Sequence, residues 1–278
     1  MKIRIGIGVE NIHPFDAFDS SYQSLLDRAT ALGYVLPNSS EQAIQNQLII
    51  ALKNAGIWSR LDGFFVFANN IFSGAVYSGL NFARLNWISP SNAPASAVSQ
   101  FPSISAKAGF TGNGSNQALN LQIAHVSGPN FANPNGSQGV LVGTIPAVSS
   151  AVLSTISTTG GANPSRVRNS QSGGTSSVVG STISSPYTAN SFVHINRKLV
   201  VATPTIQAFV NGVSAGASPI GASWSTTDTT NWHLLYNGTS WGTTQVRIAF
   251  IGGDLSQGTM PSDFNTIISN FITSLTNL

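Results

Sequence analysis

From about residue 70 onward, short apolar runs alternate with segments rich in Gly, Asn, Ser and Pro. The clearest runs lie at residues 139–145, 151–156, 191–196, 205–210, 232–236 and 245–251. Short runs rich in β-branched residues and bounded by turn formers are typical of antiparallel sandwiches and barrels. Asn211-Gly212 and Asn237-Gly238 add hairpin signals. The sequence therefore predicts a mainly β fold, in which residues 157–190 form either loops or strands with a small-residue face.

The region before residue 70 has a helical pattern instead. Ser20 or Ser21 is expected to cap a first helix that ends at Gly33. A second helix is expected from Ser39, which has capping-box spacing to Gln42, to Gly56. The apolar faces are Leu25, Leu26, Ala29 and Leu32 in the first helix, and Ile44, Leu48, Leu52 and Ala55 in the second. This pattern predicts an αα-hairpin that leads into a first core strand at residues 64–67.

The chain also ends in a helical pattern. Ser262 is a candidate cap, Pro261 precedes it, and Asp263 suits the positive end of the helix dipole. The buried face is expected to comprise Phe264, Ile267, Ile268, Phe271 and Leu275.

The first residues alternate with period two, which predicts a strand. Ile3, Ile5, Ile7 and Val9 share one face of it. A lone terminal strand needs a partner in its own sheet or in a neighbour's. The expected organisation is an attachment arm at 1–19, a helical hairpin at 20–69, and a β-sandwich with a C-terminal helix at 70–278.

Charged residues make up only 8% of the chain, against roughly 25% in an average soluble domain. A surface built from Ser, Thr, Asn, Gln and Gly has little charge repulsion, and it suits a protein that assembles. The net charge of +3 is spread without a basic cluster, so no nucleic-acid partner is expected. No run of apolar residues is long enough to insert into a membrane.

No Asp or Glu occurs between Asp62 and Asp228. Glycoside hydrolysis usually needs two carboxylates beside the scissile bond, and calcium needs several oxygen ligands. The remaining acids Asp228, Asp254 and Asp263 are expected in loops or at a helix start. The four histidines have no metal-binding spacing. We therefore expect no enzymatic activity, no metal site and no cofactor.

Aromatic side chains in expected loops offer a different chemistry, because the apolar face of a sugar stacks on a ring. Trp224, Asp228, Asn231 and Trp241 are the candidate carbohydrate-binding residues. The alternative is that these rings fill the core or a subunit interface. Trp58 and Trp87 are expected in the core.

Several sequence blocks occur in a fixed order at residues 49–62, 80–81, 109–116, 193–197, 209–213 and 248–256. In this order they resemble phage-encoded lectin-like proteins of the concanavalin A-like (laminin G-type) jelly-roll superfamily. The resemblance spans residues 40–278. It implies a jelly roll of two curved antiparallel sheets, and members of this superfamily bind sugars, serve structural roles or hydrolyse glycans. This chain lacks the acidic strand motif of the hydrolases and the acids of the calcium-dependent members.

The sequence thus predicts a concanavalin A-like antiparallel β-sandwich that serves as a bacteriophage virion structural protein. It would be a capsid-associated, spike or fibre subunit with a lectin-like domain suited to host surface glycan. Expected partners are other virion proteins and copies of itself, with the arm Ile3, Ile5, Ile7 and Val9 docking on another subunit. Without a recognisable signal peptide, synthesis in the host cytoplasm and residence in the virion are expected. The alternatives are a carbohydrate-binding adhesin outside a virion and a polysaccharide-degrading enzyme.

Overall fold

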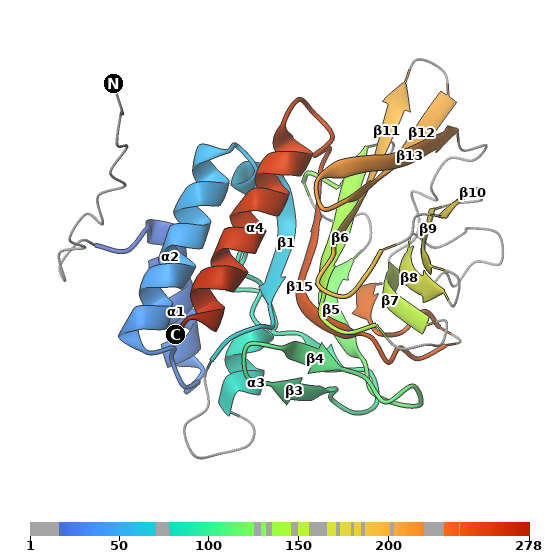
Figure 1. The fold of residues 1–278 in the computed structure, drawn as a ribbon. Helices are drawn as coiled ribbons and strands as arrows, with labels where there is room; N and C mark the ends of the chain where they lie inside the picture. The colour runs from blue at the N-terminus through green and yellow to red at the C-terminus, as the bar shows by residue number, and fades with distance from the viewer. Residues whose placement is uncertain are drawn as a thin grey trace, which may run out of the picture.

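In the computed structural model, two β-sheets face each other and helices cover the outer face of one of them (Figure 1). The structure describes residues 17–70, 78–124, 129–131, 135–145, 150–155, 166–170, 173–178, 181–184, 187–200, 203–219, 231–238 and 240–278. The predicted arm residues Ile3, Ile5, Ile7 and Val9 lie outside this description, as do Trp224 and Asp228. The division at residues 19 and 69 stays a prediction.

Eight of the described strands form the first sheet, in the order β13-β12-β11-β6-β15-β4-β3 with β1 also paired to β15. Their bounds are β1 Leu61–Val66, β3 Ser103–Ser105, β4 Gly109–Thr111, β6 Gly136–Val142, β11 Phe192–Val200, β12 Thr203–Val210, β13 Val213–Pro219 and β15 Gln245–Gly252. All of these pairings are antiparallel.

The second sheet contains seven described strands in the order β10-β9-β8-β7-β14-β5-β2. Their bounds are β2 Ser96–Ala97, β5 Leu119–Ala124, β7 Ser150–Thr155, β8 Arg166–Ser170, β9 Gly173–Val178, β10 Ser181–Ser184 and β14 Asn231–Leu234. For residues 157–190 the sequence left two alternatives, loops or strands. The described parts of this segment include β8 to β10, which pair as antiparallel strands.

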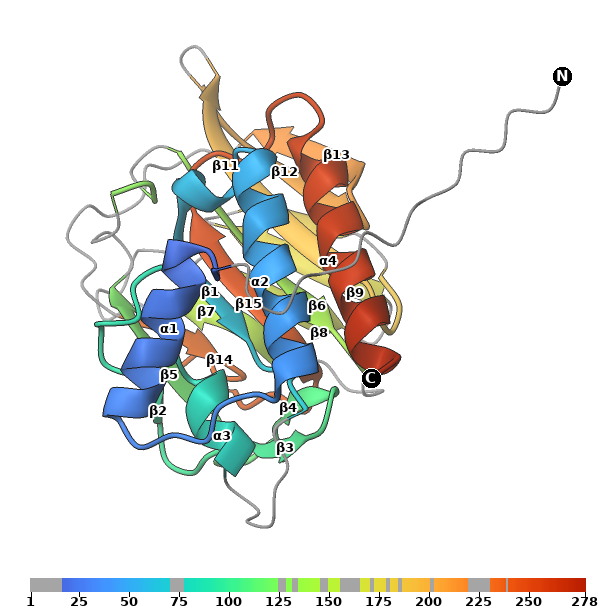
Figure 2. The same cartoon turned by 90° about the vertical axis from the view of Figure 1, so that its left-hand side faces the viewer.

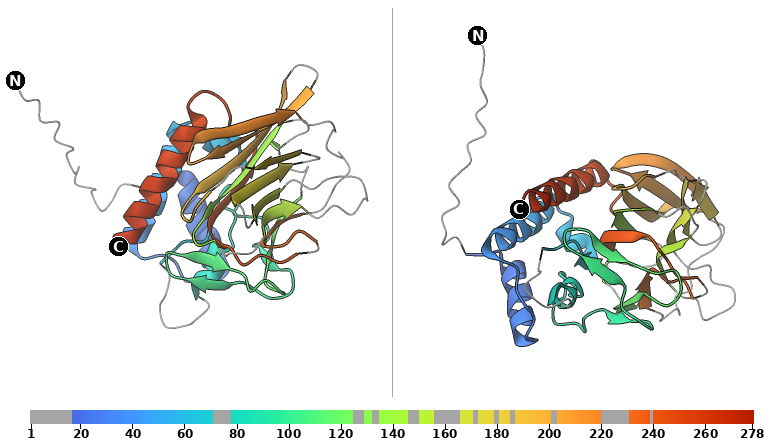
Figure 3. Two further views of the ribbon diagram at one scale, coloured as in Figure 1. Left: turned by 45° about the vertical axis from the view of Figure 1, so that its right-hand side comes forward. Right: turned by 60° about the horizontal axis from the view of Figure 1, so that its bottom comes forward.

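The helical elements are α1 Ser20–Ala31, α2 Ser39–Asn54, the short 3-10 helix η1 Trp58–Arg60, α3 Ser78–Ala83 and α4 Met260–Thr276. Helices α2 and α4 lie side by side over the first sheet (Figure 2), and the second sheet lies on the far side of the first (Figure 3). No helix in the described part of the chain is long and apolar enough to cross a membrane.

Two apolar layers hold these elements together. Between the sheets, side chains such as Val140, Ile195 and Trp232 form one buried cluster. Between the first sheet and the helices, Phe64, Phe250 and Phe264 belong to a second cluster. Strand β1 is buried along its whole length because it contributes to both layers. The predicted mainly β antiparallel sandwich, with an αα-hairpin before it and a helix after it, is confirmed.

The predicted helix caps need correction. Asp19 and Asn38 cap α1 and α2, because their side-chain oxygens accept hydrogen bonds from the N–H groups of Ser21 and Glu41. Ser20, Ser21 and Ser39 are not the caps, and Gln42 donates to the carbonyl of Pro37 instead of closing a capping box. At the C-terminus, α4 is preceded by Thr259 rather than Ser262, whose hydroxyl donates to the Thr259 carbonyl.

The predicted hairpin at Asn211-Gly212 is confirmed. These two residues join β12 to β13 with φ values of 52° and 78°, the left-handed values that this turn requires. The Asn211 side chain also accepts a hydrogen bond from the N–H of Phe192 at 2.9 Å. The turn therefore connects three neighbouring segments of the first sheet.

Candidate functional site

Connections between the two sheets converge at one end of the sandwich. The described parts of these connections are residues 112–118, 143–145, 187–191 and 235–244 without residue 239, and we call them the crossover end. Backbone N–H groups link them in two pairs, from Gly114 to the Gly242 carbonyl at 3.3 Å and from Asn190 to the Gly143 carbonyl at 2.9 Å. The N–H of Gly143 joins the two pairs, because it donates at 2.8 Å to the carbonyl of Gln245, directly after residue 244. Segments that are distant in the sequence therefore lie together on one surface.

An aromatic pair forms the centre of the crossover end. The ring centroids of Tyr236 and Trp241 are 4.3 Å apart, and the ring planes are inclined by 33°. The two residues face each other in an isolated antiparallel bridge across the Asn237-Gly238 turn. Both are half-buried and pack against the inter-sheet core. The pair therefore has a supported inner side and an outer side in contact with solvent.

The turn that carries this pair has an unusual backbone. Leu235 has a φ of 66°, which is rare for a residue with a branched bulky side chain. Its N–H donates to the Val152 carbonyl at 2.7 Å, and its carbonyl accepts from the N–H of Gly242 at 2.8 Å. Backbone strain held in place by neighbours is frequent at functional sites. Leu235, with this φ value, directly precedes Tyr236, which is bridged to Trp241.

An exposed polar loop lies directly beside Trp241. Gly112 approaches the neighbouring Gly242 so closely that an added Cβ would lie 2.2 Å from the Gly242 carbonyl oxygen. At the tip, the Asn113 side chain accepts from the N–H groups of Ser115 and Asn116 at 3.0 and 3.1 Å. Its amide nitrogen donates to the Asn116 side chain at 2.7 Å. The loop thus presents fixed amide and hydroxyl groups next to the ring.

The crossover end carries no charged side chain. Residues 112–118, 143–145, 187–191 and 235–244 contain no Asp, Glu, Lys, Arg or His. An aromatic surface bordered by neutral donors and acceptors can bind an uncharged polar molecule that has one apolar face. Its described residues offer no charged side chain that could form an ion pair with a ligand.

The structure separates two of the predicted site residues. Asn231 lies at the start of β14 opposite Ala124, while Trp241 lies beyond the other end of this strand and pairs with Tyr236. At about 3.3 Å per residue, β14 separates Asn231 from Leu234, at the other end of the strand, by roughly 10 Å. Of the predicted set, Trp241 alone is described at the crossover end, because Trp224 and Asp228 lie outside the described residues.

Tyr236, Asn113 and Asn116 were not predicted as site residues. The signal that could have identified Tyr236 is an Asn-Gly turn flanked by two aromatic residues. The other tryptophans have different places. Trp87 and Trp232 are fully buried, and Trp58 is half-buried with its ring 6.3 Å from that of Phe64.

The described carboxylates make contacts within the fold. Asp62 accepts from the N–H groups of Asn130 and Phe131, the latter at 2.6 Å, and burial raises the pKa of its carboxyl. Asp254 accepts from the N–H of Ser256 at 2.9 Å. Burial alone would raise the pKa of its carboxyl, but hydrogen bonds from Ser256 and Gln257 outweigh this effect and hold the pKa below its usual value. Among the described residues, no group of acids, histidines or cysteines could hold a metal ion.

The comparisons with known proteins show structures of similar fold, but no protein that matches in sequence. No protein-family model matches the sequence, and no curated protein matches it. The Trypanosoma rangeli sialidase in complex with 2,3-difluorosialic acid has a TM-score of 0.52 at 10% identity. A mutant of this sialidase displaying trans-sialidase activity has a TM-score of 0.51 at 10% identity. Each match covers 83% of this chain and 39% of the sialidase, so the chain spans well under half of that protein.

The CBM40 of the Ruminococcus gnavus IT-sialidase, bound to α2,3 sialyllactose, matches at a TM-score of 0.36 and 13% identity, over 49% of this chain and 82% of that one. At identities this low, likeness concerns architecture and not activity. The chain is a mainly β protein in which two antiparallel sheets form a sandwich, with a layer of helices on one sheet.

Proposed function

We propose that the protein is a non-enzymatic structural subunit that binds an uncharged glycan at the crossover end. The observation that carries this proposal is the Tyr236–Trp241 pair, whose outer side is bordered by the Asn113 loop. A sugar ring would stack on Trp241 while side chains such as Asn113, Ser115 and Asn116 bond its hydroxyl groups. The sandwich beneath the pair keeps the site preformed, which lowers the entropy cost of binding.

Neutral glycans are favoured by the composition of the site. A sialylated or uronic-acid sugar would bring a carboxylate to connections whose described residues include no basic side chain. Burying an unpaired charge is costly, whereas a neutral sugar meets matching donors and acceptors. The proposal includes no catalysis, because the described acids lie in the helices, at the start of β1 and in the β15–α4 loop, away from the crossover end.

The experiment is a glycan array followed by titration of tryptophan fluorescence. We expect binding to neutral hexose or N-acetylhexosamine oligosaccharides and none to their sialylated counterparts. Because Trp241 is half-buried at the site, its emission should change on binding, and the Trp241→Phe variant should lose most of that change. An array blank at high protein concentration would contradict the glycan-binding proposal.

The proposed setting is a virion, as a capsid-associated, spike or fibre subunit. This part rests on the low charge of the chain and on the sequence resemblance to phage lectin-like proteins. Mass spectrometry of purified particles should detect the protein together with other virion proteins. A stable monomer that is absent from particles would favour the adhesin alternative.

A further inference from the structure

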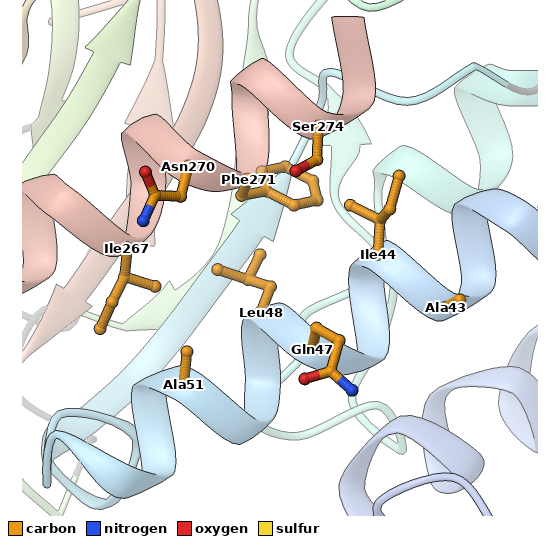
Figure 4. A pocket seen from close by; sticks show the side chains of 9 residues that line it. All are labelled: Ala43, Ile44, Gln47, Leu48, Ala51, Ile267, Asn270, Phe271 and Ser274. Atoms are coloured by element: carbon orange, nitrogen blue, oxygen red, sulfur yellow. The ribbon is translucent and has the colours of Figure 1, made fainter. Parts of the chain in front are cut away.

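A shallow groove runs between α2 and α4 on the face of the molecule opposite the second sheet (Figure 4). Its volume is about 310 Å³. Leu48 and Phe271 form a buried floor, and Ile44 and Ile267 are half-buried at its sides. Ala43 and Ala51 keep the groove open because their side chains are small. The groove is therefore an apolar channel between two helical walls.

The rim of this groove is polar but uncharged. Gln47, Asn270 and Ser274 are exposed along it, and no charged side chain lines it. A backbone lying in the groove could therefore bond these side chains or water on its outer side while its side chains face the floor. This combination suits a short extended segment with apolar residues on one face.

The start of the described chain is fixed beside the same helix. The N–H of Asp19 donates to the Asn46 side chain at 2.8 Å, and its carboxylate pairs with Lys53 at 2.6 Å. Both partners lie on α2, on a different face of this helix from the groove residues. The chain therefore leaves residue 17 next to the helix that forms one wall.

We propose that this groove is the docking site of residues 3–9 of the same chain. Ile3, Ile5, Ile7 and Val9 place four β-branched side chains on one face of an extended segment, and that face needs an apolar cover. The groove is uncharged, and so is the apolar face of the segment. The two surfaces match in chemistry and in length.

The connection is long enough for docking within one chain. Residues 10–16 can span about 23 Å when extended. The path from the Asp19 anchor around α2 to the groove is about half the circumference of a helix, roughly 17 Å, which is shorter than this span. A tether of this length gives the segment a high effective concentration at its own groove, which favours docking in the same molecule over docking on a second copy.

The spacing of side chains supports a docked register. Ala43 and Ala51 lie about 12 Å apart along α2, because each helical residue rises 1.5 Å. Ile3 and Ile7 lie about 13 Å apart in an extended strand. One side chain of the segment can thus meet Ala43 while the other meets Ala51.

The absence of cysteine from the chain allows a direct test by disulfide formation. In the full-length protein, Ile3→Cys or Ile7→Cys is combined with Ala43→Cys or Ala51→Cys. After mild oxidation, we expect one pairing for each arm position to migrate as a crosslinked monomer on a non-reducing gel. Its yield should not depend on protein concentration, and circular dichroism of the reduced variants should match the unmodified protein.

The matched controls place cysteine on the opposite face of the segment. Arg4→Cys and Gly6→Cys, with the same α2 partners, should crosslink several-fold less, because alternate residues of a strand face opposite sides. Crosslinked dimers whose yield rises with concentration would overturn docking within one chain and assign the groove to another copy. Equal crosslinking from both faces, or none from either, would overturn the proposed docking.

Discussion

The rings of Tyr236 and Trp241 pack against each other across a tight turn with their centroids 4.3 Å apart. The Tyr236 hydroxyl donates to the carbonyl of Gly238 at 2.8 Å, inside the same turn. Each ring therefore holds the other in place, and the turn holds both. A surface aromatic residue with this support has little rotamer freedom left to lose when a ligand stacks on it.

Removing the Trp241 ring should abolish most of the proposed binding. Trp241→Ala is expected to weaken neutral glycan binding by more than about tenfold, or roughly 1.5 kcal/mol, because a central aromatic contact is lost. Calorimetric titration would measure this. Val213→Ala is a suitable control, because Val213 is exposed and lies in β13. Equal glycan affinity of the two variants would show that Trp241 is not part of the binding site.

The close approach of Gly112 to Gly242 gives a second prediction. In Gly112→Ala, the new Cβ would lie 2.2 Å from the Gly242 carbonyl oxygen, so the two loops must separate. We expect a loss of about 1 to 3 kcal/mol in unfolding free energy, as in other overpacked sites. Glycan affinity should fall as well, since the Asn113 loop moves away from Trp241.

The comparison for this variant is Gly33→Ala. Gly33 also turns the chain, at a φ of 69°, but a Cβ added there would meet no heavy atom within 4 Å. Its replacement should cost only the left-handed backbone penalty of about 1 to 2 kcal/mol and leave glycan affinity unchanged. Urea titration and calorimetry on both variants separate the two effects. A loss of affinity in Gly33→Ala would contradict the assignment of the site.

Much of the fold could be predicted because its signals are local. The period of 3.6 residues in α1, α2 and α4 depends only on neighbours in sequence, and so do the Asn-Gly turn and the apolar strands. The apolar run at residues 64–67 predicted a first core strand, and the buried strand β1 confirms it. The order of strands was not predictable in this way. Strand β6 lies between β11 and β15, and both partners are distant in the sequence.

The candidate site was predicted only in part for a related reason. Tryptophans in loops can be identified from the sequence, but which of them share a surface depends on the length and direction of strands. Asn231 and Trp241 are close in sequence, yet they lie at opposite ends of β14, Asn231 at its start and Trp241 beyond its last residue. The pairing with Tyr236 depends on the positive φ of Leu235, which no propensity would assign to leucine.

The hairpin turn between β12 and β13 should contribute measurably to stability. Asn211→Ala removes the acceptor for the Phe192 N–H and places alanine at a φ of 52°. Because both effects are unfavourable, we expect the unfolding free energy to fall by about 1 to 3 kcal/mol. Val213→Ala at the next strand position should change it by less than about 0.5 kcal/mol. Urea unfolding that fails to separate these variants would contradict this role for the turn.

The buried imidazole of His194 should make stability depend on pH. Burial lowers the pKa of His194 to about 3, and neither ring nitrogen has a hydrogen-bond partner among the described residues. The ring stacks on Phe209 at 5.1 Å and meets Phe250 edge to face at 5.4 Å. The folded protein therefore holds this histidine neutral in an apolar setting.

The unfolded chain protonates this histidine near pH 6.5, but the folded chain protonates it only near pH 3. Its contribution is complete above pH 6.5 and is lost progressively as the pH falls toward 3, because the unfolded state then binds more protons. Between pH 7.5 and 5.0 the loss amounts to about 2 kcal/mol. His194→Phe keeps the aromatic contacts and should reduce the stability change over this interval by about that amount. Phe209→Leu should lower stability equally at both pH values, and urea titrations at pH 7.5 and 5.0 would distinguish the two patterns.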